Sequence, residues 1–230
     1  MLERLSSIIH LRGKYLESIR QITRLTYKEL LTKIVNIRKS FIGIPIYKGL
    51  NAYEYSPFQI TADIPFKASL FEDAADLIIY SDPKSFEEAD IILSEADRGG
   101  GPLAGAIGRK TDIPIVLANW HKEIPENLPD AIIVRTEVGF SGAGYIVVSG
   151  IKPGQKVILV DDILSTGGTA EGLIEAIENA GAIVIRAFFV GEKVNKEGRK
   201  NLNKRFPNLK ITTLTRFISK LENKVTVNGD

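Results

Sequence analysis

The segment Val157–Ala170, V-I-L-V-D-D-I-L-S-T-G-G-T-A, decides the fold of this chain. Its four apolar residues make a strand that is buried on both faces, and two acids, Asp161 and Asp162, stand at the carboxyl end. A loop of hydroxyl side chains and glycines follows and runs directly into a helix that Gly181 ends. A buried strand that passes through a glycine loop into a helix is typical of a parallel sheet covered by helices.

The same alternation of apolar strands and amphipathic helices continues on both sides of this segment. We expect strands at 90–94, 113–118, 131–137, 145–149, 156–160 and 182–190, and helices at 67–80, 102–109 and 168–179. Residues 209–227 predict further strands, which form a small C-terminal hood. The sequence therefore predicts an α/β fold with a Rossmann-like, open, mostly parallel sheet and helices on both faces.

The N-terminal part of the chain differs from the rest in composition. Residues 2–39 are rich in Arg and Lys, and their apolar residues fall mostly at helical spacing, which predicts one or two amphipathic helices. Residues 40–65 contain three prolines and two glycines and predict an irregular link. We therefore expect a helical appendage at 1–45 and one main domain at 46–230.

The composition excludes several classes of protein. The 230 residues contain no Cys and only two His, so disulfides, cysteine-based zinc sites and a cysteine nucleophile are excluded. No apolar run approaches the length of a membrane span, and the first residues lack the pattern of a secretory signal. A net charge of +2 gives no argument for binding nucleic acid. We expect a cytoplasmic protein with no membrane partner.

The loop after the two acids has the features of an anion site. The backbone N–H groups of Thr166, Gly167, Gly168 and Thr169 can point at one anion, and the helix dipole favours negative charge there. The hydroxyl of Ser165 adds a further donor. Two carboxylates beside this anion need another partner, and sugar hydroxyls or a magnesium ion bound to the sugar would serve. The segment thus predicts a site for a sugar phosphate, without the pattern of a Walker loop.

This motif resembles the phosphoribosyl pyrophosphate signature of the type I phosphoribosyltransferases. The resemblance implies that Asp161 and Asp162 are catalytic residues that hold the ribose hydroxyls and, directly or indirectly, magnesium. It implies that residues 165–169 hold the 5′-phosphate. It also implies the family's reaction, in which 5-phosphoribosyl passes from phosphoribosyl pyrophosphate to a purine base and pyrophosphate leaves. Members of the family are usually homodimers, so we expect a homodimer here.

A second glycine-rich loop lies between a predicted strand and a predicted helix, with the sequence S-E-A-D-R-G-G-G-P at 94–102. Arg98 supplies a planar cation that suits pyrophosphate, and the glycines allow the backbone to approach a ligand closely. The loop resembles the pyrophosphate loop of purine phosphoribosyltransferases, which implies that Arg98 and Gly99 bind substrate. The commoner pattern has its acid two residues before the Arg, so the roles of Glu95 and Asp97 stay open.

Five more side-chain or loop roles follow from the resemblance. A hairpin at about 120–145 corresponds to the family's flexible lid, which excludes water from the reactive sugar. In that lid Glu137 would handle a proton on the base, and Lys122 would help to hold pyrophosphate. The end of the strand at 182–190 would help to form the base pocket, where Phe188 would stack on the purine and Lys193 would bind it.

The sequence contains opposing signals about which purine base accepts the phosphoribosyl group. The A-D-R-G run, and Ser165 where hypoxanthine-guanine enzymes usually have Asp, favour adenine as substrate and AMP as product. The pair Glu192-Lys193 resembles the 6-oxopurine members instead, in which a Lys can donate to the oxo group. A second alternative is a phosphoribosyltransferase-like transcription regulator that senses a nucleotide or phosphoribosyl pyrophosphate. For that alternative L-T-Y-K-E-L at 25–30 would begin a DNA-binding head, although the segment shows no glycine turn between two helices.

Overall fold

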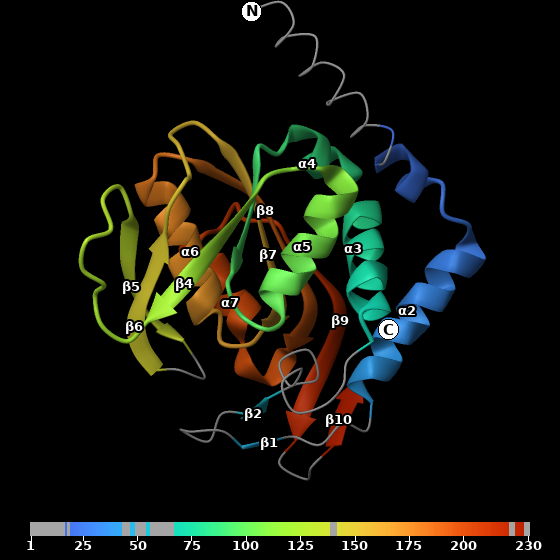
Figure 1. Cartoon of the computed structure of the whole chain (residues 1–230). Coiled ribbons are helices and arrows are strands. Elements are labelled where there is room, and N and C mark those ends of the chain that lie inside the picture. The colour runs from blue at the N-terminus through green and yellow to red at the C-terminus, as the bar shows by residue number, and fades with distance from the viewer. Residues whose placement is uncertain are drawn as a thin grey trace, which may run out of the picture.

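The computed structural model describes residues 17, 19–42, 47–48, 54–55, 67–138, 142–220 and 224–227. Within these ranges the main sheet contains eight strands: β3 (Ile91–Glu95), β4 (Ile115–His121), β5 (Ile132–Val138), β6 (Gly142–Val148), β7 (Lys156–Leu164), β8 (Ile183–Lys193), β9 (Ile211–Lys220) and β10 (Lys224–Val227). Their order is β10-β9-β8-β7-β3-β4-β6-β5 (Figure 1). The five central strands are parallel, whereas β10, β6 and β5 pair antiparallel at the two ends. A separate two-stranded sheet pairs β1 (Tyr47–Lys48) with β2 (Glu54–Tyr55).

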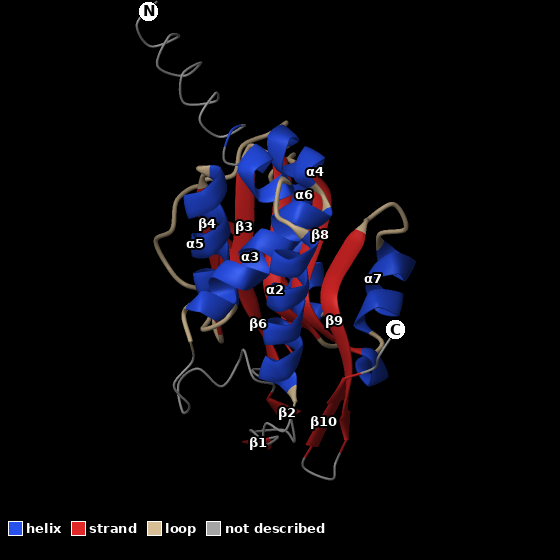
Figure 2. Cartoon of the chain, turned by 90° about the vertical axis from the view of Figure 1, so that its right-hand side faces the viewer, coloured by secondary structure: helices blue, strands red, loops and turns tan. Residues whose placement is uncertain are grey.

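Helices cover both faces of this sheet, as the sequence predicts. The helices are α2 (Tyr27–Phe41), α3 (Ser69–Ser81), α4 (Pro83–Glu88), α5 (Gly100–Thr111), α6 (Gly168–Asn179) and α7 (Gly198–Arg205), with a 3₁₀ turn at Val194–Lys196. One buried cluster joins α2, α3, α4 and α5 to the sheet, and a second cluster joins α6 and α7 to the opposite face. Figure 2 shows α5 and α7 on opposite sides of the strands. The predicted α/β class with a mostly parallel sheet is confirmed.

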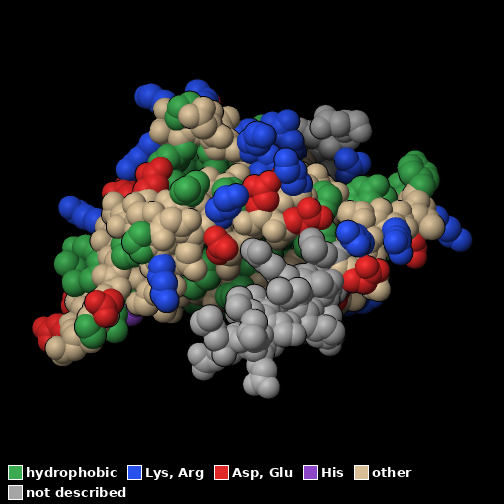
Figure 3. Space-filling model, turned by 90° about the horizontal axis from the view of Figure 1, so that it is seen from above, with side chains coloured by type: hydrophobic (Ala, Val, Ile, Leu, Met, Phe, Trp, Pro, Cys, Tyr) green, Lys and Arg blue, Asp and Glu red, His purple; other side chains and the backbone are tan. Residues whose placement is uncertain are grey.

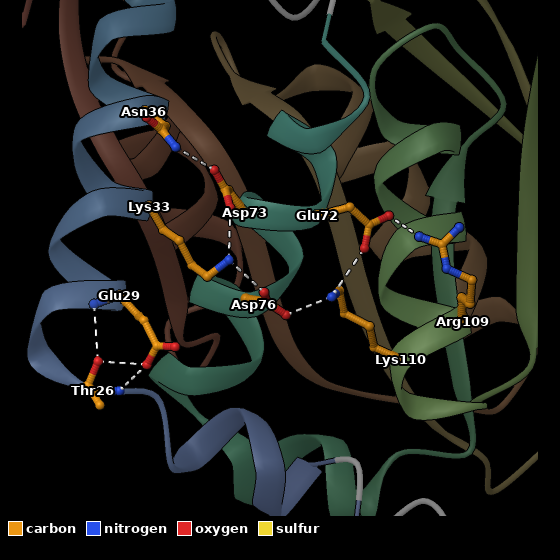
Figure 4. Close-up of polar contacts among 9 residues, drawn as sticks. All are labelled: Thr26, Glu29, Lys33, Asn36, Glu72, Asp73, Asp76, Arg109 and Lys110. Carbon is orange, nitrogen blue, oxygen red and sulfur yellow. Dashed lines mark hydrogen bonds and ion pairs between the residues drawn. The ribbon is translucent and has the colours of Figure 1, made fainter.

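Helix α2 packs on the same core as the main sheet. Its first turn is closed by a capping box, in which Thr26 and Glu29 exchange hydrogen bonds between side chain and backbone. At the other end Phe41 is fully buried, with its ring centroid 5.1 Å from that of Phe217 on β9. Between these ends Nζ of Lys33 forms ion pairs with α3, at 2.8 Å from Oδ1 of Asp73 and 2.9 Å from Oδ2 of Asp76 (Figure 4). The expected domain boundary at 45/46 lies beside residues outside the described ranges and stays a prediction.

Figure 3 shows the molecule from above the view of Figure 1. The amino ends of the parallel strands lie on this side, because α4 leads into β3 here. On this face Lys and Arg side chains are interspersed with Asp and Glu (Figure 3). The loops at the opposite, carboxyl ends of β3 and β7 form the edge at which open parallel sheets bind ligands. Among the described residues, none of the helices is both long and apolar enough to cross a membrane.

Candidate functional site

The carboxyl ends of β3 and β7 bring the two predicted motifs together. These strands are parallel neighbours, with Leu93 opposite Leu159. The loop after β3 therefore folds over the acids that end β7. A Cβ atom on Gly99 would overlap the Oδ2 atom of Asp162, and one on Gly100 would lie 2.8 Å from Oδ1 of Asp161. Both positions need glycine because the backbone passes directly over the two carboxylates.

Three carboxylates gather at this point, one more than the sequence motif contains. Ligand atoms of Asp97, Asp161 and Asp162 all lie within 4.8 Å of one another. Asp161 and Asp162 are 5% and 2% exposed, and Oδ2 of Asp162 is buried with no hydrogen-bond partner in the described part of the chain. Carboxylate oxygens are the ligands that magnesium prefers, so these residues fit the expected cation.

Burial sets the charge state of this cluster. Desolvation, and after it the charge of Asp97, raises the pKa values of Asp161 and Asp162 well above their ordinary range. Desolvation also raises the pKa of Asp97. The pKa of Glu95 rises to about 8, first through desolvation and then through the charges of Asp97 and Asp162. A bound cation or a hydroxyl donor would stabilise these groups in their charged form.

The loop after β7 forms one wall of a cleft that also contains the acids. The cleft is lined by Glu95, Asp97, Asp161–Ala170 and Phe189. Gly167 precedes helix α6 with φ of 93°, a left-handed conformation that favours glycine. No side chain caps α6 at Gly167, and the hydroxyl of Ser165 is buried without a hydrogen-bond partner among the described residues. Residues 165–169 thus line the cleft, and no side chain among the described residues caps the N-terminus of α6. Their predicted role as an anion site stays a prediction.

The loop after β3 is arranged differently. Oδ1 of Asp97 accepts hydrogen bonds from the N–H groups of Gly99, at 3.0 Å, and Gly100, at 2.6 Å. The side chain of Arg98 is exposed and does not line the cleft described above. Because Asp97 already pairs these N–H groups, they are not available to pyrophosphate in this conformation. The predicted pyrophosphate role of Arg98 and Gly99 stays a prediction.

The predicted lid is the β5–β6 hairpin, which pairs with β4 through β6. Its tip at 139–141 lies outside the described residues. The side chain of Glu137 is exposed and lines a neighbouring hollow together with Arg135, Glu171 and Arg205. Lys122 is also exposed, directly after β4, and is not among the residues that line the cleft. The structure thus places neither Glu137 nor Lys122 against the acids.

The two aromatic residues near the end of β8 lie on opposite faces of the sheet. Phe188 is fully buried in the cluster beneath α2–α5, with its ring stacked 5.3 Å from that of Phe86. Phe188 therefore does not line the cleft, and its predicted stacking on a purine stays a prediction. Side chains alternate along a strand, and it is Phe189 that lines the cleft. Lys193 is 1% exposed and is not among the residues that line the cleft, although its charge partly offsets the rise in the pKa of Asp162 that desolvation causes.

The sequence interpretation assigned no role to two side chains that contact the β7–α6 turn. Thr136 on β5 and Asn201 on α7 each donate a hydrogen bond to a carbonyl of this turn. Neither lies in a recognisable motif, and they are 65 residues apart in the chain. Only the folded structure brings them to the same loop.

The site of this α/β protein is thus a strand-to-helix turn without a side-chain cap in the described part of the chain, next to buried carboxylates at the edge of a parallel sheet. The family model described as "Phosphoribosyl transferase domain" matches residues 72–220 of this chain. The chain belongs to the phosphoribosyltransferase family, and the resemblance seen in the β7 motif is confirmed.

Curated relatives support the same family, and a solved structure supports the fold. The chain is 34% identical over 194 residues to the hypoxanthine/guanine phosphoribosyltransferase of Methanocaldococcus infernus, which covers 84% of this chain and 100% of that protein. The protein of the same name from Methanothermococcus okinawensis is 37% identical over 153 residues, 66% of this chain and 78% of that protein. The fold is similar to adenine phosphoribosyltransferase from Rhodothermus marinus, with a TM-score of 0.62, 20% identity and coverage of 81% and 99% of the two chains. At that identity the likeness shows the fold alone.

Proposed function

We propose that this protein transfers 5-phosphoribosyl from phosphoribosyl pyrophosphate to a purine base and releases pyrophosphate. The observation that carries the proposal is the cleft itself, in which Asp161 and Asp162 stand directly before a turn with free N–H groups. A phosphorylated sugar presents hydroxyls that carboxylates can accept from and a phosphate that N–H groups can bind. No other cluster among the described residues combines buried carboxylates with the N-terminus of a long helix.

Different residues of the cleft would bind different parts of the substrate. The N–H groups and hydroxyls of residues 165–169 would hold the 5′-phosphate, with the dipole of α6 stabilising its charge. Asp161 and Asp162 would accept hydrogen bonds from the ribose hydroxyls and would stabilise the positive charge that develops on the sugar. The buried setting strengthens these electrostatic interactions because it excludes water.

Magnesium fits the acidic end of this cleft. Asp97, Asp161 and Asp162 would hold the ion, directly or through water, and the ion would neutralise the charge of the pyrophosphate leaving group. The backbone N–H of Asp162 donates to Oδ1 of Asp161 at 2.9 Å. That hydrogen bond fixes the first acid of the pair.

For the base we propose a 6-oxopurine, hypoxanthine or guanine, instead of the adenine that the A-D-R-G run favours. Two observations support this choice. The relatives with 34–37% identity named above are hypoxanthine/guanine enzymes. In addition, Lys193 follows Glu192 at the end of β8, and the resemblance to the 6-oxopurine members implies a Lys there whose ammonium group donates to the oxo oxygen of the base. The Arg98 that favoured adenine is exposed here.

The direct experiment is a transfer assay with phosphoribosyl pyrophosphate, magnesium and each of hypoxanthine, guanine, xanthine, adenine and orotate. We expect the highest kcat/KM with hypoxanthine or guanine, and a selective loss for these bases in Lys193→Met. A preference for adenine would overturn the base assignment and leave the reaction standing. No transfer to any base would overturn the reaction and would turn attention to the regulator alternative.

A further inference from the structure

The β7–α6 turn is packed between two elements that lie far apart in the sequence. On one side, a Cβ atom on Gly198, the first residue of α7, would overlap the carbonyl oxygen of Ser165. On the other side, a Cβ atom on Gly168 would overlap the carbonyl oxygen of Glu137 on β5. The turn therefore touches the backbone of α7 and the backbone of the hairpin at the same time (Figure 1).

A side chain from each of these elements holds one carbonyl of the turn. Nδ2 of Asn201 donates to the carbonyl oxygen of Thr166 at 3.0 Å. Oγ1 of Thr136 donates to the carbonyl oxygen of Gly168, also at 3.0 Å. These two carbonyls belong to the stretch of residues that lines the cleft.

Because the peptide bond is planar, these two hydrogen bonds also orient the N–H groups of the residues that follow. In a trans peptide the C=O and the N–H of the following residue point in opposite directions. A carbonyl of Thr166 held by Asn201 therefore directs the N–H of Gly167 away from α7. In the same way, a carbonyl of Gly168 held by Thr136 directs the N–H of Thr169 away from β5. Both Gly167 and Thr169 line the cleft.

We propose that Asn201 and Thr136 are positioning residues for the 5′-phosphate, because they aim the N–H groups of Gly167 and Thr169 at it. The inference rests on the proposed function and deepens it. Neither side chain lines the acid-containing cleft, so each acts through the loop and not on the substrate. Preorganised donors bind an anion more tightly because they need no reorientation when it arrives.

The helix that carries Asn201 is itself held at both ends. Arg199 donates to both carboxylate oxygens of Glu192 on β8, at 2.7–3.1 Å, and to the carbonyl of Ile211 at 2.9 Å. At the other end Arg205 forms ion pairs with Glu171 and Glu175 on α6. Because α7 is fixed to the sheet and to α6, Asn201 can hold the turn in one conformation.

The test is the affinity for ribose 5-phosphate, measured by calorimetry on the full chain, with pyrophosphate as a second ligand. We expect Asn201→Ala and Thr136→Val each to weaken ribose 5-phosphate binding about 3- to 10-fold, the range set by one hydrogen bond. Pyrophosphate binding should stay within about twofold. Asn203→Ala, the same substitution on the exposed face of the same helix, should change neither affinity.

Further variants and the melting temperature separate positioning from folding. Thr136→Ser keeps the hydroxyl and should restore the affinity lost in Thr136→Val. Asn201 is exposed, so Asn201→Ala should keep the wild-type melting temperature. Unchanged ribose 5-phosphate affinity in Asn201→Ala, with normal binding by the wild-type protein, overturns the positioning role alone. Equal losses for both ligands overturn it as well. A wild-type protein that binds no ribose 5-phosphate overturns the proposed function and this role with it.

Discussion

The turns that follow β3 and β7 have the same topology and opposite chemistry. Each leads from a buried strand through glycines into a helix, and each has a polar side chain three residues before the helix begins: Asp97 before α5 and Ser165 before α6. Asp97 accepts hydrogen bonds from its own loop, whereas Ser165 has no partner for its hydroxyl among the described residues. The N–H groups of the first turn are paired with the turn's own carboxylate, whereas the second turn has no side-chain acceptor among the described residues.

This difference shows that a glycine loop at a helix N-terminus is not by itself an anion site. The N–H groups of such a loop are available to an anion only where no side chain of the protein already accepts hydrogen bonds from them. In the β3 turn the paired carboxylate belongs to a cluster of acids. That turn therefore contributes negative charge to the cleft, while the β7 turn contributes donors.

The largest effect should come from closing the open turn. Gly168→Ala places a Cβ atom against the carbonyl oxygen of Glu137, a backbone atom that cannot move aside cheaply. A displacement of about 1 Å in the donors can lower kcat/KM roughly 100-fold, and the overlap should also lower the free energy of unfolding by about 1–3 kcal/mol. In Gly101→Ala, the control in the β3 turn, the new Cβ would meet nothing closer than 3.8 Å. Steady-state kinetics that show equal losses in both variants would remove the distinction between the turns.

The next largest effect concerns the acids beside the open turn. Asp162→Asn should lower kcat/KM about 10- to 150-fold, the range for losing a charged hydrogen bond. Stability should not fall, because the raised pKa of Asp162 means that burial disfavours its charge, and Asn carries none. Turnover and thermal unfolding, measured on the same preparation, test both statements. Wild-type turnover in this variant would contradict the ribose contact.

A third substitution should make the capped turn resemble the open one. Asp97→Ser removes the internal anion and leaves the N–H groups of Gly99 and Gly100 without their acceptor. Pyrophosphate binding in the absence of magnesium should then become about 3- to 10-fold tighter, because a charge is removed and two donors are freed. Calorimetry provides the measurement. Weaker pyrophosphate binding under these conditions would show that the carboxylate does not compete with the ligand.

The smallest predicted effect is on stability as a function of pH. The pKa of Glu95 rises from 4.5 to about 8 in the folded protein, so the folded state binds more protons than the unfolded state between these values. The free energy of unfolding should therefore fall as the pH rises through this window. The raised pKa values of Asp97, Asp161 and Asp162 act in the same direction. We expect the melting temperature to drop by roughly 5 °C across the window.

Glu95→Gln is the matched variant for this measurement, because it keeps the shape of the side chain and removes its titration. Differential scanning calorimetry should show a smaller drop in this variant than in the wild-type protein. A melting temperature of the wild-type protein that rises with pH across the same window would contradict the buried, mutually repelling cluster.

The sequence predicted the fold well because its signals are local. Apolar strands, glycine loops and helical periodicity placed every strand from β3 to β8 and the helices α3, α5 and α6. Half of the candidate site could also be predicted from a local signal, since Asp161, Asp162 and residues 165–169 lie in one short segment. Their position in one cleft is what the motif predicts.

The remaining parts of the site depend on contacts that no local pattern encodes. Phe188 and Phe189 are adjacent and chemically identical, and only the phase of β8 decides which one faces the cleft. Asp97 joins the acids because the β3 loop folds over β7, and Asn201 reaches Thr166 because α7 packs on the turn. Such pairings are fixed by tertiary packing, so they could not be read from spacing.

The central claim is that the β7–α6 turn holds the 5′-phosphate while the adjacent acids hold the ribose. A crystal structure of the protein with a ribonucleoside 5′-monophosphate tests it most directly. We expect the phosphate oxygens at about 2.7–3.2 Å from the N–H nitrogens of Gly167 and Thr169, with the ribose hydroxyls hydrogen-bonded to Asp161 and Asp162. A phosphate bound at another helix terminus, with the turn vacant and the ribose away from both acids, would contradict the claim.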